Sequence, residues 1–219
     1  MDYYPIFLDL TDRRCLVVGG GSVAEGKVRG LLAAKADLTL VAPSLSSDLQ
    51  QLGSAGRIRH LDREYESNDL EGADLCFVAT DDGAINARVA ADCRERGVWV
   101  NAADDPANCD FILPAVVRSG SVVVAASTSG TSPALARRLR EELTAFLDEG
   151  YGPLSDLLGA VRSEVRALGM RIDPEAWQRA IDTRLRTLVA QGRLDDARAH
   201  LRRALGIDKQ PATPARPEA

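Results

Sequence analysis

The chain of 219 residues is long enough to bury one large core or two small ones, and 45% of its residues are hydrophobic. Its net charge of −5 argues against a general nucleic-acid binder, which needs a basic surface. No apolar run approaches the roughly 20 residues that span a bilayer, and no charged-then-apolar leader opens the chain, so we expect a cytoplasmic protein without membrane contact.

The first predicted strand, Cys15–Val18, runs directly into a glycine-rich turn and a helix that ends near Ala34. Gly19-x-Gly21-x-x-Ala24 matches the alanine-ended fingerprint of dinucleotide-binding folds. In this fingerprint the first glycine permits a tight turn, the second lets a pyrophosphate approach the backbone, and the helix N-terminus receives the phosphate charge. A mere tight turn is the alternative, but the position between a strand and a helix favours the fingerprint.

The second predicted strand, Leu38–Ala42, ends where a dinucleotide fold usually carries an acid that bonds the ribose. This chain has Pro43 and Ser44 there, so Ser44 or backbone groups would have to hold the ribose. No arginine replaces the acid, so the sequence does not evidently invite a 2′-phosphate.

Further strands are predicted at 58–61, 74–80 and 98–101, and helices at 45–52 and 84–96. This alternation is typical of a parallel sheet with right-handed crossovers, whose ligands bind at the carboxyl ends of the strands. Asp81 and Asp82 are interpreted first as a helix cap. The residues expected at the carboxyl ends are Gly21, Thr80, Asp81, Asn101 and Asp104.

The paired acids Asp104 and Asp105 leave two interpretations open. They are either the start of a solvated turn before Pro106 or a carboxylate poised to take or give a proton. With no histidine nearby in the sequence, a carboxylate is the best available base.

The pattern changes after Pro106. Residues 111–117 and 122–126 are predicted to form a hairpin joined by Arg118–Ser121, followed by a helix over 134–147. The loop Ser127–Ser132 offers hydroxyls and a helix N-terminus, which together can bind an anion with help from Arg137 and Arg140. An ordinary capped helix with a solvated basic face is an equally open interpretation.

The remainder is predicted to be helical, over 154–168, 174–189 and 195–205, and its apolar stripes, which include Trp177, are interpreted as core or interface. The four cysteines form no Cys-x-x-Cys pair and are interpreted as plain thiols in a reducing compartment. Two distant histidines do not make a typical transition-metal site, so any metal chemistry would have to use carboxylates, and no metal-binding residues are predicted.

Seven motifs follow one another between residues 3 and 150. They are Pro5–Leu10, Cys15–Ala24, Leu38–Pro43, Ala79–Asp82, Asn101–Asp104, Phe111–Ala115 and Ser127–Arg140. As a set they resemble the precorrin-2 dehydrogenase / sirohydrochlorin ferrochelatase family, the module at the N-terminus of bacterial siroheme synthase. The methyltransferase module of some members has no match in the sequence, so the chain resembles a stand-alone form.

The resemblance implies an α/β fold in three parts: a Rossmann-like dinucleotide-binding domain with a parallel sheet at 1–112, a β-hairpin and helix for dimerisation at 113–148, and an all-helical domain at 149–208. Residues 209–219, rich in proline, are expected to form a disordered tail. In such a homodimer the active site lies between the subunits.

The resemblance also implies an activity. NAD accepts a hydride from precorrin-2, a tetrapyrrole with eight carboxylate side chains, to give sirohydrochlorin. Many members then insert Fe²⁺, some insert Co²⁺, and some lack metal insertion. The family's catalytic aspartate matches Asp104, and its NAD contacts match Ser22, Val23, Pro43 and Ser44. The missing ribose acid is shared by the family, and a serine that some members phosphorylate matches Thr128.

Residue patterns and resemblance together give two sets of expected site residues. The cofactor set is Gly19, Gly21, Ser22, Val23, Pro43, Ser44, Thr80 and Asp81. The substrate set is Asn101, Arg118, Ser127, Thr128, Ser129, Arg137 and Arg140. A non-catalytic NAD-sensing module is the alternative function, although such modules usually carry the ribose acid. A short-chain reductase is excluded because no tyrosine has a lysine four residues later.

Overall fold

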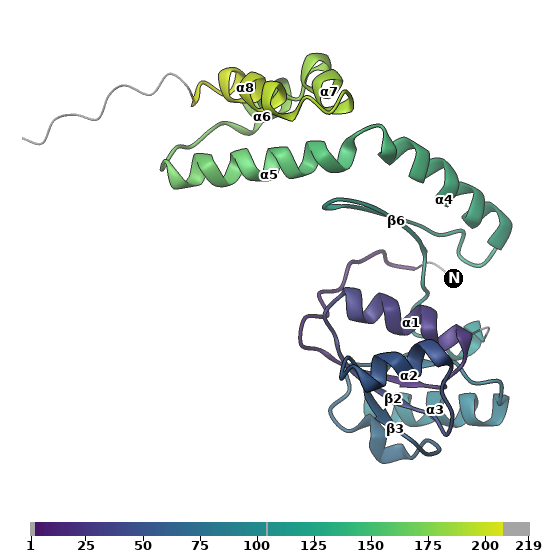
Figure 1. Cartoon of the computed structure of the whole chain (residues 1–219). Coiled ribbons are helices and arrows are strands. Elements are labelled where there is room, and N and C mark those ends of the chain that lie inside the picture. The colour runs from purple at the N-terminus through teal and green to yellow at the C-terminus, as the bar shows by residue number, and fades with distance from the viewer. Residues whose placement is uncertain (1–2, 104, 208–219) are drawn as a thin grey trace, which may run out of the picture. The chain divides into compact units, whose positions relative to one another are not determined.

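A computed structural model describes residues 3–103 and 105–207, and its internal contacts divide the chain into two compact units, Met1–Leu113 and Pro114–Ala219. The predicted fold class is confirmed: a parallel sheet with helices comes first, and a hairpin and a series of helices follow it (Figure 1). The finer domain boundaries drawn from the sequence remain predictions.

The first unit is a five-stranded sheet in which every neighbouring pair is parallel, in the order β3-β2-β1-β4-β5. Its strands are β1 (Arg14–Val18), β2 (Asp37–Val41), β3 (Arg59–Leu61), β4 (Leu75–Val78) and β5 (Trp99–Ala102). Its α-helices are α1 (Ser22–Ala33), α2 (Ser47–Ser54) and α3 (Gly83–Arg96), with short 3₁₀ turns η1 (Ser67–Leu70) and η2 (Pro106–Asn108).

Both faces of this sheet are buried, which explains why its strands are almost continuously apolar. Alternate residues of β1 point to opposite faces: Cys15 and Val17 lie in the cluster that α1 and α2 cover, and Leu16 and Val18 lie in the one that α3 covers. Because all five strands run the same way, their carboxyl ends meet at one edge. The loops that follow β1, β2, β4 and β5 therefore share that edge.

The first strand of the hairpin in the second unit begins later and ends later than the sequence predicted, so the turn is shorter. Its strands are β6 (Ala115–Ser119) and β7 (Val122–Ala126), paired so that Ser119 faces Val122. Phe111, which we expected in the first strand, packs instead edge-on against Phe77 in the first unit, with ring centroids 5.5 Å apart. Arg118, expected in the turn, lies in β6, because Gly120 takes a φ of +54° and closes a two-residue turn.

In the part of the chain described up to residue 207, five helices follow the hairpin: α4 (Pro133–Asp148), α5 (Tyr151–Ala167), α6 (Pro174–Ala180), α7 (Thr183–Ala190) and α8 (Leu194–Ala204). The single helix predicted over 174–189 is wrong, because the chain breaks at Ile181 and Asp182 and Asp182 caps a new helix. Helices α5 to α8 share a core that includes Val161, Leu185 and Leu201, with Trp177 packed against it, so the interpretation of Trp177 as a core residue is confirmed.

Two further findings concern the described residues alone. No helix among them is both long and apolar enough to cross a membrane. The four cysteines, all within this part of the chain, are free thiols, three of them buried and Cys109 half-buried. The predicted tail at 209–219 lies outside the described residues.

The cap at Asp182 gives a pH-dependent prediction for the helical unit. Its carboxylate accepts a hydrogen bond from the backbone N–H of Leu185 at 2.7 Å and lies 2.9 Å from Nε2 of His200. The Leu185 bond first, and His200 after it, hold the pKa of Asp182 below its ordinary value of 3.8. A lowered pKa means that the carboxylate stabilises the fold above pH 3.8 and that this contribution is lost as the pH falls through the lowered value.

We expect Asp182→Ala to lower the free energy of unfolding by about 1 kcal/mol at neutral pH, the usual worth of an N-cap. The measurement is urea unfolding followed by Trp177 fluorescence in a Trp99→Phe background. Asp173→Ala is the control, because Asp173 precedes α6 without capping it through its side chain. A difference between Asp182→Ala and its parent that does not shrink as the pH falls below 3.8 would contradict the assignment.

Candidate active site

The glycine turn after β1 is wedged between the loops that follow β2 and β4. Gly19 has a φ of +118°, and its N–H donates to the carbonyl of Val41 at 2.9 Å. A Cβ at Gly19 would lie 2.2 Å from the carbonyl oxygen of Ala79. No side chain fits there, so the turn confirms the sequence argument for a glycine at this position.

Gly20, to which the sequence argument gave no role, is packed as closely against backbone atoms as Gly19 is. A Cβ on it would lie 1.9 Å from the carbonyl oxygen of Ser44, and its own carbonyl accepts from the N–H of Ser46 at 2.8 Å. The middle glycine therefore lets the loop after β2 close onto the turn. This contact brings Pro43 and Ser44, both exposed, next to the turn. The motif treats position 20 as variable, so only the tertiary contact reveals its use.

Gly21 is different from its neighbours, because a Cβ there would meet nothing within 4 Å. It is the N-cap residue of α1, and no side chain caps the helix. Ser22 and Val23 in the first turn are exposed. An open approach to an uncapped helix N-terminus is the geometry that a pyrophosphate requires. The residues present thus fit the pyrophosphate of a dinucleotide.

The loop after β4 is organised by a short polar network. The hydroxyl of Thr80 donates to Oδ1 of Asn86 at 2.6 Å, and Nδ2 of Asn86 donates to the carbonyl of Thr80 at 3.0 Å. Oδ1 of Asp82 accepts from the N–H groups of Ala84 and Ile85, so the cap interpretation is confirmed for Asp82. Asp81 is exposed at the same edge. Thr80 and Asp81 remain candidates for binding the cofactor, because Gly19 lies next to the backbone of Ala79 and Thr80.

The end of β5 is held by hydrogen bonds to the loop that follows it. Asn101 is 7% exposed, and its amide is engaged on both sides: it accepts from Nζ of Lys27 at 2.9 Å and donates to the carbonyl of Phe111 at 2.9 Å. This amide therefore shapes the strand end. Asp105 accepts from Nδ2 of Asn108 at 2.6 Å, which gives its carboxylate a structural partner inside the loop. Asp104, the predicted catalytic residue, lies outside the described residues.

The rest of the predicted substrate set lies in the second unit. Arg118 is exposed on β6, and Arg137 and Arg140 are exposed on α4. In the loop before α4, the Thr128 hydroxyl donates to the carbonyl of Ser132 at 3.1 Å, and the hydroxyl of Ser132 caps the helix by accepting from Leu135. The ordinary-cap interpretation of Ser132 is therefore confirmed. Anion binding by Ser127, Thr128 and Ser129 remains a prediction.

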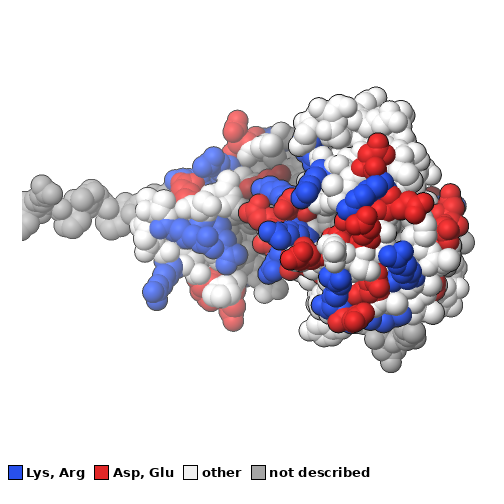
Figure 2. Space-filling model, turned by 90° about the horizontal axis from the view of Figure 1, so that it is seen from below, with Lys and Arg blue, Asp and Glu red and all other residues white. Residues whose placement is uncertain are grey.

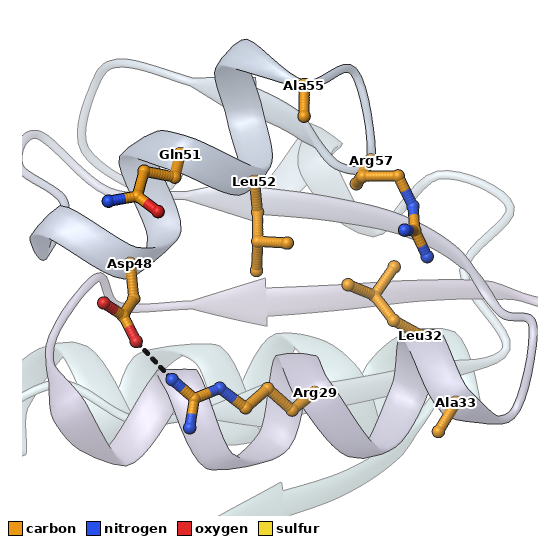
Figure 3. Close-up of a pocket in the computed structure, with 8 residues that line it drawn as sticks. All are labelled: Arg29, Leu32, Ala33, Asp48, Gln51, Leu52, Ala55 and Arg57. Carbon is orange, nitrogen blue, oxygen red and sulfur yellow. Dashed lines mark hydrogen bonds and ion pairs between the residues drawn. The ribbon is translucent and has the colours of Figure 1, made fainter.

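A pocket of about 610 Å³ lies elsewhere, between α1 and α2 (Figure 3). Arg29 and Asp48 form an ion pair across it. Its α1 residues begin eight positions after Gly21, roughly 12 Å along the helix, and it contains none of the expected site residues. On the face shown in Figure 2, basic and acidic side chains are interspersed, so that face presents no large patch of one charge.

Comparison with known proteins agrees with this geometry. Residues 6–115 match the family described as "Putative NAD(P)-binding", and residues 124–145 match the one described as "Sirohaem biosynthesis protein central". The first match spans the sheet unit with its glycine turn. The second covers the end of the hairpin, the Ser/Thr-rich loop and most of α4.

Individual relatives point the same way. The chain is 41% identical over 209 residues to siroheme synthase 1 of Serratia proteamaculans and 40% identical over 203 residues to siroheme synthase of Photobacterium profundum. These alignments cover 94% and 92% of this chain, but it spans only 44% and 43% of the two relatives. Among solved structures, the precorrin-2 dehydrogenase SirC matches with a TM-score of 0.74 and 29% identity, over 90% of this chain and 99% of SirC.

Proposed function

Because the chain belongs to the siroheme synthase family of NAD(P)-binding proteins, we propose that it oxidises precorrin-2 to sirohydrochlorin with NAD as the hydride acceptor. The observation that carries this proposal is the match to the precorrin-2 dehydrogenase SirC over 99% of its length. The open glycine turn supports it, because it supplies the nucleotide site that the reaction needs.

NAD supplies the hydride acceptor when bound, and the chain's own residues do the rest. Gly21 and the first turn of α1 hold the pyrophosphate, while Pro43 and Ser44, held next to the turn through Gly20, lie where the ribose is expected. Hydride loss leaves a cationic macrocycle that must shed a proton. Asp104 is proposed as the base that takes this proton. The reaction balances as precorrin-2 and NAD⁺ giving sirohydrochlorin, NADH and a proton.

The substrate's acid side chains require cationic partners. Arg118, Arg137 and Arg140 are proposed to supply them, together with hydroxyl and N–H groups of the loop Ser127–Ser129, since charge-assisted bonds to carboxylates are strong. Their exposure in the second unit is consistent with this role.

Two further parts of the proposal concern assembly and metal insertion. Val116, Leu135 and Phe146 are 38%, 50% and 48% exposed around the hairpin and α4, a surface that favours a homodimer.

Siroheme formation would also need Fe²⁺ as a substrate. No group of three or more acidic, histidine or cysteine side chains among the described residues could hold a metal. We propose that the pyrrole nitrogens of the macrocycle bind the iron and that Asp104 takes the two displaced protons one after the other, passing each to water.

The testing experiment supplies the protein anaerobically with precorrin-2, with and without NAD. Sirohydrochlorin and NADH are expected to form together, and only when NAD is present. Fe²⁺ added with sirohydrochlorin, without NAD, is expected to give siroheme. A flat absorbance trace in that experiment rejects the metal-insertion activity and leaves the dehydrogenase proposal standing. NAD binding without turnover or tetrapyrrole affinity would reject the enzyme and favour a sensing module.

A further inference from the structure

We propose that Cys109 is a positioning residue for the catalytic base, because its thiol ties together the backbone on the two sides of residue 104. The inference rests on the proposed function, in which Asp104 removes the proton. It extends that function to a residue that would act through Asp104.

The sulfur of Cys109 makes contacts before and after position 104. It accepts a hydrogen bond from the backbone N–H of Ala102 at 3.2 Å. It also lies 3.1 Å from the carbonyl oxygen of Ala102 and 3.3 Å from that of Asp105, either of which can receive its proton. One side chain thus links the last residue of β5 to the residue just after position 104.

A second set of bonds closes the base of the same loop. The N–H of Val100 donates to Oδ2 of Asp110 at 2.9 Å, and the N–H of Asp110 donates to the carbonyl of Val100 at 2.8 Å. Nδ2 of Asn101, which donates to Phe111, also lies 3.7 Å from the Cys109 sulfur. These bonds fix where the loop leaves and rejoins the sheet. The thiol adds cross-links inside the loop, and these border the proposed base.

The protonation state suits this role. Burial is the main cause that raises the pKa of the Cys109 thiol, while the Ala102 hydrogen bond acts in the opposite direction. The group therefore stays a thiol at neutral pH and keeps the proton that it donates to a carbonyl. A small apolar filler is the competing explanation for a half-buried cysteine. The two explanations predict different effects of substitution on kcat. Serine keeps a hydrogen-bond donor and an acceptor and alanine keeps neither, so only a positioning role predicts that serine replaces the thiol better than alanine does.

The test compares the full-length wild type with Cys109→Ala and Cys109→Ser in the anaerobic precorrin-2 assay. Cys109→Ala is expected to lower kcat about 10-fold, a typical result of misplacing a reacting group by a fraction of an ångström. Its KM and Kd for NAD are expected to stay within about twofold, because the glycine turn belongs to other loops. Cys109→Ser is expected to recover most of the lost kcat.

Cys15→Ala is the matched control, since Cys15 is also a packed thiol but lies near the amino end of β1, away from the site edge. Its kcat is expected to stay near that of the wild type. The positioning role is overturned if Cys109→Ala keeps the wild-type kcat. It is also overturned if the kcat of Cys109→Ser is as low as that of Cys109→Ala or lower. A wild-type protein without precorrin-2 turnover overturns the proposed function instead.

Discussion

Asp104→Asn is expected to lower kcat for NADH formation from precorrin-2 by about 100-fold or more, the range usual for loss of a general base. The substitution keeps the size of the side chain and removes only its capacity to take a proton. NAD affinity is expected to change little, because the proposed nucleotide site is formed by the glycine turn and the loop after β2. Single-turnover kinetics together with an NAD titration separate the two effects.

Asp105→Asn is the matched control for this variant. The Asp105 carboxylate already accepts a hydrogen bond from Asn108 inside the loop, and an amide oxygen can accept the same bond. Its activity is therefore expected to remain within a few-fold of the wild type. If Asp105→Asn lost activity and Asp104→Asn kept it, the base would be assigned to the wrong one of the two neighbouring acids.

Gly21→Val is expected to weaken NAD binding by about 100-fold or more while leaving the fold intact. The backbone at Gly21 has a φ of −89° and a ψ of −170°, which any residue adopts, and a Cβ there meets nothing of the protein within 4 Å. The added side chain would occupy the space through which, in the proposed site, the pyrophosphate approaches the helix N-terminus. Isothermal titration with NAD measures the loss, and thermal unfolding without NAD checks the fold.

Gly26→Val is the control for the Gly21 variant, because Gly26 lies in the same helix and is equally open around its Cβ. It is expected to bind NAD like the wild type. Equal affinities for Gly21→Val and wild type would show that the nucleotide does not approach α1 at this glycine.

The sheet unit was predictable from the sequence because its signals are local. Apolar strands alternate with segments whose apolar residues recur at helical spacing, and the dinucleotide fingerprint lies between the first strand and the first helix. Together these signals identify a parallel sheet that binds its ligand at one edge. Phe111 and Ile181 show where local pattern fails. Phe111 has the apolar neighbours of a strand but packs on Phe77, and the chain breaks at Ile181 because Asp182 starts a new helix.

The candidate site was predictable only in part, for the same physical reason. Gly19 and Gly21 belong to a motif, whereas the use of Gly20 depends on the loop around Ser44, which is 24 residues later in the chain. Cys109 carried no signal beyond a plain thiol, because its partners are backbone groups placed by the path of the loop. Residue pattern left the role of the paired acids Asp104 and Asp105 open, and the family resemblance singled out Asp104. The structure adds only that the Asp105 carboxylate accepts a hydrogen bond from Asn108.

The central claim is that a nucleotide on the glycine turn takes hydride directly from the tetrapyrrole. The most direct measurement is a single anaerobic turnover of precorrin-2 that carries deuterium on the carbon to be oxidised, followed by mass spectrometry of the nicotinamide. Deuterium is expected on the reduced nicotinamide, in an amount equal to the sirohydrochlorin formed. Sirohydrochlorin that accumulates while NAD stays oxidised, or NADH that carries only protium, would contradict the account.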